Sequence, residues 1–379
     1  MRVRFSLAAQ TKQPAHVGCF VLAIYEIIES KLTLKYNKMA IKCLNFMRLP
    51  QISLIGYFII AILALYFLWR ERKKPSQWCG RYRLQIYHFA ALLILFGIFL
   101  LANLISIYLV WLGIILLITS FIAPHFLVVN KQNIKINALT GIKIAFVADL
   151  QLGMSWKKTK WAQKIVDKIK DAKPDLVLLG GDLIDNEGGF ADECSYLSPF
   201  GLIANQFPIY YVMGNHEYGA GQQSIFMFEN QADKLARTMA KLNIPLLKNN
   251  LVTIKINNKE INIFGIDDIW GGKADFAELN NWNKITPLIF LTHNPDGILS
   301  WPFNIKKPDL VLAGHTHGGQ IHLPGLGPVV SAEIKLPRKH YRGLSHYNNI
   351  PIFTTVGAGE SAAPIRFGVM PEVVVLEIK

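Results

Sequence analysis

The chain has 379 residues, of which 51% are hydrophobic, and its formal net charge is +14. A positive mean hydropathy of +0.28 is too high for a purely soluble protein and indicates segments that meet lipid. Residues 1–140 hold 16 Lys and Arg against 3 Asp and Glu, whereas residues 141–379 are nearly neutral. This excess therefore bears on membrane topology and argues against a nucleic-acid surface. The four cysteines stand far apart, which excludes a zinc knuckle and a disulfide framework and fits a reducing compartment.

Two uncharged stretches predict membrane-spanning helices. Residues 52–69 meet the length of one span and end at Arg70. Residues 89–127 would form a helix of roughly 60 Å, about twice the hydrocarbon thickness, so we predict two spans that turn near residues 103–106. Buried helices of a soluble bundle would need a polar stripe at helical period, and neither stretch shows one. The sequence predicts a transmembrane region of about three helices at residues 51–123.

The charges between these stretches predict the orientation. The loop at residues 70–83 carries six basic side chains against Glu71 alone, and short basic loops stay in the cytoplasm. We therefore predict a multi-pass protein of the inner (cytoplasmic) membrane, with everything after the last span in the cytoplasm. Residues 1–50 form a basic N-terminal segment whose short apolar run, residues 17–28, suits an interfacial helix. This segment would be untranslated if initiation is at Met39 or Met47.

After residue 127, short β-rich runs alternate with amphipathic segments, which predicts an α/β domain at residues 124–379. The predicted strands are residues 142–148, 176–179, 209–213, 251–256, 260–266, 288–291 and 310–313, and the predicted helices are residues 156–172 and 224–242. Asn257 and Asn258 indicate a hairpin turn. A short polar cluster follows five of the apolar runs, where open α/β sheets place their ligands.

These clusters contain donors for metal ions. They hold Asp149 and Gln151, Gly180 to Asp182, Gly214 to Glu217, His293, and Gly314 to His317. Carboxylate, amide and imidazole donors without a thiolate suit manganese, iron, zinc or nickel. Two such ions close together can clamp a phosphoryl group and activate a water. The glycines allow the backbone to approach the site closely.

The clusters resemble the calcineurin-like metallophosphoesterase superfamily, whose motifs run D-x-H, G-D, G-N-H-E, H and G-H-x-H in this order. The resemblance covers residues 124–379 and implies a four-layer αββα sandwich with two divalent metal ions. It implies that one ion is held by Asp149, Gln151, Asp182 and His317, and the other by Asp182, Asn215, His293 and His315. Asp182 would bridge the ions and be catalytic. The resemblance also implies that Asn215 and His216 bind substrate and that His216 protonates the leaving group. Glu217 is either part of this machinery or a structural hydrogen-bond partner.

Gln151 departs from the family pattern, which has histidine at this position. A neutral amide oxygen is a weaker donor for zinc, so we expect manganese, or magnesium, at the first site. The alternative is that this site is degraded. The manganese-dependent ADP-ribose and CDP-alcohol diphosphatases look similar here, which shows that glutamine is compatible with activity.

Two other positions allow two interpretations each. The segment at residues 357–366 resembles a membrane-linked branch of YaeI-like and YkuE-like enzymes, and its Arg366 is predicted to pair with a substrate phosphate oxygen, or else to form a structural salt bridge. Asp267 and Asp268, which follow a strand, are either a carboxylate pair in an outer shell of the site or an ordinary turn, and the turn is favoured.

The sequence therefore predicts a membrane-anchored, two-metal hydrolase of phosphodiester or pyrophosphate bonds. Anchoring favours a lipid-linked substrate, and the branch includes enzymes that cleave UDP-2,3-diacylglucosamine in lipid A biosynthesis. The partners are then membrane lipids and this substrate, with no nucleic acid; no oligomeric state is predicted. The alternatives are a CDP-alcohol diphosphatase, a nuclease, for which the near-neutral catalytic half is unsuited, and a metal-poor scaffold, which would lack several ligands.

Overall fold

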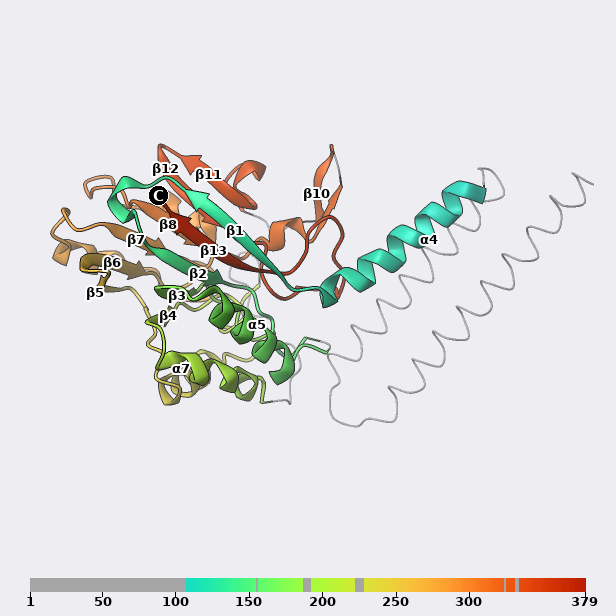
Figure 1. The fold of residues 1–379 in the computed structure, drawn as a ribbon, viewed down its shortest axis with the longest axis horizontal. Helices are drawn as coiled ribbons and strands as arrows, with labels where there is room; N and C mark the ends of the chain where they lie inside the picture. The colour runs from blue at the N-terminus through green and yellow to red at the C-terminus, as the bar shows by residue number, and fades with distance from the viewer. Residues whose placement is uncertain (1–106, 155, 187–191, 222–227, 324, 331–333) are drawn as a thin grey trace, which may run out of the picture.

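The computed structural model describes residues 107–154, 156–186, 192–221, 228–323, 325–330 and 334–379 (Figure 1). The predicted N-terminal segment and the predicted spans before residue 107 lie outside the described residues. The strands are β1 (Val128–Ile134), β2 (Lys143–Val147), β3 (Leu176–Leu179), β4 (Ile209–Tyr211), β5 (Asn250–Ile256), β6 (Lys259–Gly265), β7 (Leu288–Leu291), β8 (Leu310–Ala313), β9 (Ile321–Leu323), β10 (Gly327–Val330), β11 (Gly343–Tyr347), β12 (Ile350–Thr354) and β13 (Glu372–Ile378).

The helices are mostly short. The α-helices are α4 (Ile107–Ile122), α5 (Thr159–Ala172), α6 (Gly201–Ala204) and α7 (Ala232–Lys241). The 3-10 helices are η1 (Ala123–His125), η2 (Asn137–Leu139), η3 (Glu193–Phe200), η5 (Ala277–Asn281), η6 (Pro295–Ser300), η7 (His317–Gly319) and η8 (Arg338–His340).

Two sheets pack against each other to form the domain. Within the described residues, one has five strands in the order β1-β13-β2-β3-β4 and the other has six in the order β11-β12-β8-β7-β6-β5. Strands β2, β3 and β4 are parallel neighbours, and so are β6, β7 and β8. Successive side chains of a strand face opposite sides of its sheet. In β3, Leu176 and Leu178 enter the core between the sheets, whereas Val177 and Leu179 enter the core beneath the helices.

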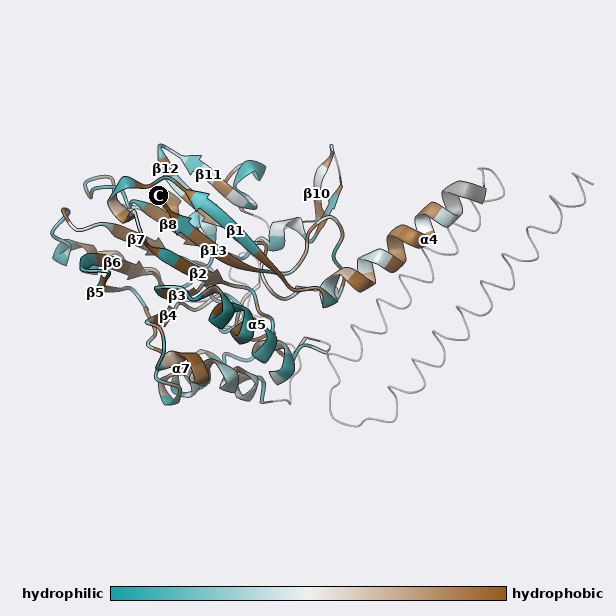
Figure 2. Ribbon diagram, in the orientation of Figure 1, coloured by the Kyte–Doolittle hydropathy of each residue, from teal (hydrophilic) through white to brown (hydrophobic). Residues whose placement is uncertain are grey.

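The two outer layers differ. Helix α5 places Trp161, Ile165 and Ile169 at helical spacing on the first sheet, and its outer face is hydrophilic (Figure 2). Over the second sheet, the described cover contains the 3-10 helices η5 and η6 and no α-helix. Several asparagines, Pro295 and Gly297 in these turns disfavour a continuous α-helix. The predicted α/β sandwich is confirmed as a mixed α/β sandwich, and its second outer layer consists of 3-10 helices and turns within the described residues.

The predicted elements match the structure where an apolar run is short and buried. The strands at residues 176–179, 288–291 and 310–313 have the predicted bounds. Asn257 and Asn258 have φ of 51° and 66° and form the predicted turn between β5 and β6. Helix α5 begins later than predicted, because Lys157 N donates to Met154 O in a turn. Helix α7 covers only the end of the segment predicted at residues 224–242, of which residues 224–227 lie outside the described ones.

Helix α4 projects from the domain and carries no charged residue (Figures 1 and 2). Its exposed large side chains are Trp111, Leu112, Ile115, Leu116, Ile118, Phe121 and Ile122. Within the part of the chain that the structure describes, no helix combines the length and the apolar character needed to cross a bilayer. The predicted turn at residues 103–106 lies outside that part.

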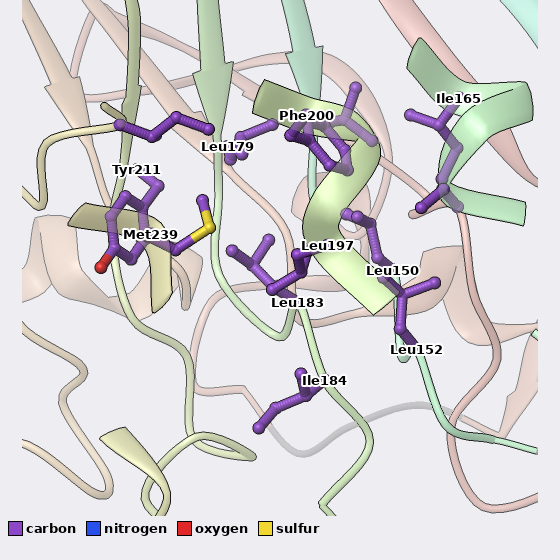
Figure 3. Packing of buried hydrophobic residues seen from close by; sticks show 14 of the residues in the cluster. Leu150, Leu152, Ile165, Leu179, Leu183, Ile184, Leu197, Phe200, Tyr211 and Met239 are labelled. Atoms are coloured by element: carbon purple, nitrogen blue, oxygen red, sulfur yellow. The ribbon is translucent and has the colours of Figure 1, made fainter. Parts of the chain in front are cut away.

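The loop after β2 alternates between the core and the polar edge of the sheets. Leu150 and Leu152 are fully buried and pack into the core beneath η3 and α5 (Figure 3). Asp149 precedes Leu150, and Gln151 lies between the two leucines. Their φ angles are 52° and 47°. These left-handed residues reverse the side-chain direction at successive positions, so the leucines anchor a loop whose polar side chains face elsewhere.

We predict that Leu150→Ala lowers the free energy of unfolding by about 2–5 kcal/mol, because the truncated side chain leaves a cavity in a fully packed core. The measurement is urea unfolding of the full chain in detergent, followed by tryptophan fluorescence. The control is Leu202→Ala, since Leu202 is 56% exposed and its truncation should cost no more than about 0.5 kcal/mol. Equal losses for the two variants would show that the loop leucine is not an anchor.

Candidate metal centre

The side chains that could hold metal ions converge where the carboxyl ends of strands from both sheets meet. Ligand atoms of Asp182, His293 and His315 lie within 4.8 Å of one another. A second group, formed by Asp149, Asp182 and His317, satisfies the same limit. All five residues are buried, and Asp182 belongs to both groups. The structure thus brings together the predicted ligands around one shared carboxylate.

Asp182 lies at the centre of this cluster and contacts several of the other residues. Its Oδ1 accepts a hydrogen bond from His216 N (3.0 Å), and its Oδ2 accepts one from Gln151 Nε2 (3.0 Å). The same Oδ2 lies 3.3 Å from His293 Nε2. A Cβ on Gly214 would collide with Asp182 Oδ1, so only glycine lets the loop after β4 approach this carboxylate.

Asp149 is held by the loop after β8. His315 N lies 2.8 Å from Asp149 Oδ1 and 3.0 Å from Oδ2, and donates to this carboxylate. A Cβ on Gly314 would lie 2.6 Å from Asp149 Oδ2. His317 Nε2 lies 3.8 Å from Asp149 Oδ1, while its Nδ1 donates to Gly359 O (3.1 Å). This hydrogen bond fixes the tautomer of His317 and leaves Nε2 as the donor atom for a metal.

Around the second group, lone pairs face one another. Asn215 Nδ2 donates to Ala220 O (2.7 Å), which turns Asn215 Oδ1 toward His293 Nε2 (3.2 Å) and His315 Nδ1 (3.1 Å). His293 Nδ1 donates to Gly180 O (2.8 Å), so its Nε2 is an acceptor once the ring is neutral, as a metal ligand must be. Acceptors this close repel one another unless a cation or a proton lies between them.

Gln151 gives a direct test of fit for a metal ion. Its Oε1 is buried and has no hydrogen-bond partner among the described residues. A buried acceptor left unpaired costs about 1–3 kcal/mol, and a cation would satisfy it. The amide that departs from the family motif therefore retains an oxygen suited to a hard ion, as the sequence predicts for manganese or magnesium.

The electrostatics of the cluster suit cations. Burial, aided by Arg366, lowers the pKa of His317 to about 3, and burial also lowers the pKa of His315 well below its ordinary value. Both rings are therefore neutral, as metal ligands must be. Burial raises the pKa of Asp149 to about 7. Burial lowers the pKa of His293, but the carboxylate of Asp182 outweighs it and the net pKa is well above the ordinary value. The site thus favours positive charge beside Asp182.

His216 lies at the edge of the cluster and is partly accessible. Its Nδ1 donates to Asp185 O (2.7 Å), and its Nε2 lies 3.9 Å from Asp182 Oδ2. Its side chain is 12% exposed, whereas the side chains of Asp182 and His293 are at most 2% exposed. Of these three, His216 is therefore the side chain that a substrate reaches most easily.

Glu217 has a structural role, one of the two alternatives that the sequence left open. Its fully buried carboxylate accepts hydrogen bonds from four backbone N–H groups, those of Asp182, Leu183, Ile184 and Gly214. Glu217 thus joins the loop after β3 to the loop after β4, and so holds Asp182 and Asn215 in place.

Arg366 lies behind the first group of ligands. It is fully buried and pairs with Glu360 (Nε to Oε1, 3.2 Å), and its Nη2 donates to Val356 O (2.8 Å) and to Gly359 O. The structural salt bridge that the sequence left open is therefore present. Because Gly359 O also accepts from His317, the guanidinium supports the position of a ligand. A direct contact between Arg366 and a substrate stays a prediction.

Sequence reasoning missed several residues near the centre. Lys157, fully buried, pairs with Glu360 (2.9 Å), but nothing in its loop distinguishes it from a surface lysine. The Trp270 ring meets His315 edge-on, with centroids 4.5 Å apart.

Asp268 does form the predicted turn, accepting from Trp270 N (2.9 Å). Its position after a predicted strand, like that of the other clusters, was the signal that it borders the site.

The comparisons with known proteins identify the family of this chain. The family model of calcineurin-like phosphoesterases matches residues 142–319, a range that includes every predicted ligand. The chain is 32% identical over 240 residues to phosphodiesterase YaeI of Escherichia coli, covering 62% of this chain and 82% of YaeI. It is 25% identical over 268 residues to the uncharacterized metallophosphoesterase YkuE of Bacillus subtilis, covering 68% and 88%. A solved dimetal phosphatase from Danio rerio aligns with 58% of this chain and 89% of its own at 11% identity and a TM-score of 0.34.

We predict that Gln151→Met lowers the affinity of the first ligand group for manganese at least about tenfold, since even outer-shell changes at metal sites cost this much. The group of Asp182, His293 and His315 should keep its ion. The measurement is manganese content by mass spectrometry after dialysis against graded metal concentrations. The control is Gln132→Met, on the exposed strand β1. An unchanged manganese content would remove Gln151 from the ligand set.

We predict that Glu217→Gln lowers the free energy of unfolding by about 3 kcal/mol, because an amide cannot replace a carboxylate that accepts from four N–H groups. Urea unfolding measures the change, and Glu260→Gln, at an exposed position of β6, is the matched control. A loss no larger than that of the control would contradict the structural role of Glu217.

Proposed function

Since this chain belongs to the calcineurin-like phosphoesterase family and is a metal-dependent phosphoester hydrolase, we propose that it cleaves a phosphodiester or pyrophosphate bond at a two-metal centre held beside a membrane. The observation that carries the proposal is the pair of ligand groups that share Asp182. Two sites that share one carboxylate suit two ions that act on the same phosphoryl group.

We assign the ligands to the two ions as the geometry groups them. Asp149, Gln151, Asp182 and His317 would hold the first ion, and Asp182, Asn215, His293 and His315 the second. When bound, two divalent ions polarise the phosphoryl oxygens and lower the pKa of the attacking water. Manganese fits the amide oxygen of Gln151 best, and zinc, iron, magnesium and nickel are the other candidates.

His216 is the proposed general acid. Because its Nδ1–H is committed to Asp185 O, its Nε2 is the ring atom that can give a proton to the leaving oxygen. Asn215 would contact the same phosphoryl group from the neighbouring position. Arg366 adds positive charge behind His317 and Asp149, and we include it with Asn215 and His216 among the substrate-binding residues on electrostatic grounds.

We further propose that the chain is a multi-pass protein of the inner (cytoplasmic) membrane, with its catalytic domain in the cytoplasm. This proposal is supported by the uncharged stretches within residues 51–123, by the basic loop at residues 70–83, and by the exposed apolar side chains of α4. Confinement to the bilayer raises the effective concentration of a lipid-linked substrate. UDP-2,3-diacylglucosamine, cleaved in lipid A biosynthesis, is the specific candidate, and the similarity to a phosphodiesterase supports the reaction type.

We predict that His216→Ala lowers kcat about 10²- to 10⁴-fold on a phosphodiester with alkyl leaving groups, such as glycerophosphoethanolamine, because an alkoxide needs a proton to leave. The same variant should lose far less activity on bis-p-nitrophenyl phosphate, because p-nitrophenolate leaves without protonation. Kinetics of the full chain in detergent with manganese measure both effects, and manganese content should remain that of the wild type. Equal losses on all substrates would contradict the role of general acid.

Asp182→Ala is the control for the metal centre itself, since it removes the carboxylate that both groups share. It should abolish hydrolysis of every substrate and lower the manganese content. Full activity in this variant would remove the two-metal proposal. Cleavage of single-stranded DNA at a higher kcat/KM than any of these substrates would instead favour a nuclease.

A further inference from the structure

The β9–β10 hairpin exposes an apolar tip. Leu326 is 75% exposed and Val329 is 56% exposed. The hairpin forms a separate sheet of two strands, β9 and β10. Gly325 and Gly327, on either side of Leu326, have φ of 77° and 81° and form the turn that carries the leucine outward. Grouped exposed apolar side chains of this kind mark a surface that meets a protein or a membrane.

The root of this hairpin lies at the metal centre. Strand β9 begins at Ile321, directly after the turn that contains the ligand His317. Its His322 N donates to Phe367 O (2.8 Å), and Phe367 N donates to Gln320 O (3.0 Å). The hairpin is therefore fixed at its base to residues adjoining Arg366.

The same segment holds the end of α4. Arg366 N donates to Ser120 O (2.9 Å) in the last turn of the helix, and Lys157 Nζ donates to Pro124 O (3.3 Å) just beyond it. Because Arg366 and Phe367 are consecutive, the end of α4 and the root of the hairpin are neighbours. Figure 1 shows α4 and the hairpin, marked by β10, projecting beyond the sheets at the same end of the molecule.

One exposed basic side chain, that of Arg342, lies near the base of the hairpin. Arg338, Lys339 and Arg342 are exposed and follow the hairpin in the chain. Burial and the nearby charge of Arg342 lower the pKa of His322, which places this guanidinium beside β9. Exposed apolar side chains with a basic side chain near them favour the interface of a membrane that contains anionic lipids.

We propose that the β9–β10 hairpin is a membrane-docking element, which inserts Leu326 and Val329 into the interfacial layer of an anionic bilayer beside α4. Arg342 then faces the lipid headgroups. This arrangement sets the metal centre against the membrane surface. The inference for the substrate rests on the proposed function: the scissile phosphoester belongs to the headgroup of a lipid that stays in the bilayer during cleavage.

The first test measures contact with lipid directly. Leu326→Cys is labelled with an environment-sensitive fluorophore in a full chain whose Cys19, Cys43 and Cys79 are replaced by serine. The buried Cys194 is retained, because burial raises the pKa of its thiol to about 11 and keeps it unreactive. The chain is reconstituted into phosphatidylcholine vesicles with phosphatidylglycerol and with lipids carrying a spin label near the headgroup, which quenches only adjacent fluorophores.

The matched control is Ile285→Cys. Ile285 is 85% exposed but precedes β7, so it lies at the opposite edge of the sheet from the ligand His293, which follows that strand. We expect quenching of the label at position 326 and little at position 285. Absence of quenching at position 326, or equal quenching at both positions, would overturn the proposal. If hydrolysis of bis-p-nitrophenyl phosphate is normal in the same sample, such a result leaves the proposed hydrolase function standing.

The second test connects docking to turnover. Leu326→Asp should lower kcat/KM roughly tenfold on a dioleoylglycerol p-nitrophenyl phosphodiester embedded in phosphatidylglycerol vesicles, as expected when one apolar side chain is withdrawn from lipid. Hydrolysis of soluble bis-p-nitrophenyl phosphate should be unchanged, and Ile285→Asp should affect neither substrate. An equal loss on both substrates, or no loss on the vesicle substrate, would overturn the docking role.

Discussion

The constraint on which the site depends is the burial of two carboxylates beside neutral imidazoles at the meeting edge of two sheets. Asp149 is fully buried and Asp182 is 2% exposed. An unpaired buried carboxylate is strongly unfavourable, and one protonated His293 beside Asp182 offsets only one of the two charges. Divalent cations would resolve this conflict, because each would neutralise charge and accept the facing lone pairs of Asn215 and His293. Glu217 and the glycines hold the loops of these side chains in place, so the carboxylates remain buried close together.

The positions of the ligands were predictable because each follows a short apolar run whose end also ends a buried strand. Parallel strands bring such ends to one edge, so Asp182 after β3 and His293 after β7 had to approach each other once the two sheets packed face to face. The assignment of individual ligands to each ion came from the family resemblance, and the shared position of Asp182 agrees with it.

The support behind the ligands could not be predicted in the same way. Lys157 is far in sequence from Glu360 and Arg366, yet the three form one buried cluster with two cations on one carboxylate. Backbone carbonyls such as Val356 O and Gly359 O share the second positive charge. A pattern of apolar and polar residues cannot reveal such partners, because each charge taken alone indicates an exposed side chain. Strand β13 was also missed, and its pairing with β1 and β2 places it inside the sheet.

This buried cluster also relates the metal centre to the apolar end of the molecule. Gly359 O accepts from both His317 and Arg366, and the backbone of Arg366 holds Ser120 in α4. Residues 357–367 thus contact the predicted ligand His317, contain Glu360 and Arg366 of the ion pair, and hold the end of α4. The same segment also anchors β9. A rigid segment common to all of them fixes the distance and angle between the catalytic cluster and the apolar helix. Reaction with a substrate in a fixed plane, such as a lipid headgroup, requires that kind of constraint, whereas a freely diffusing substrate does not.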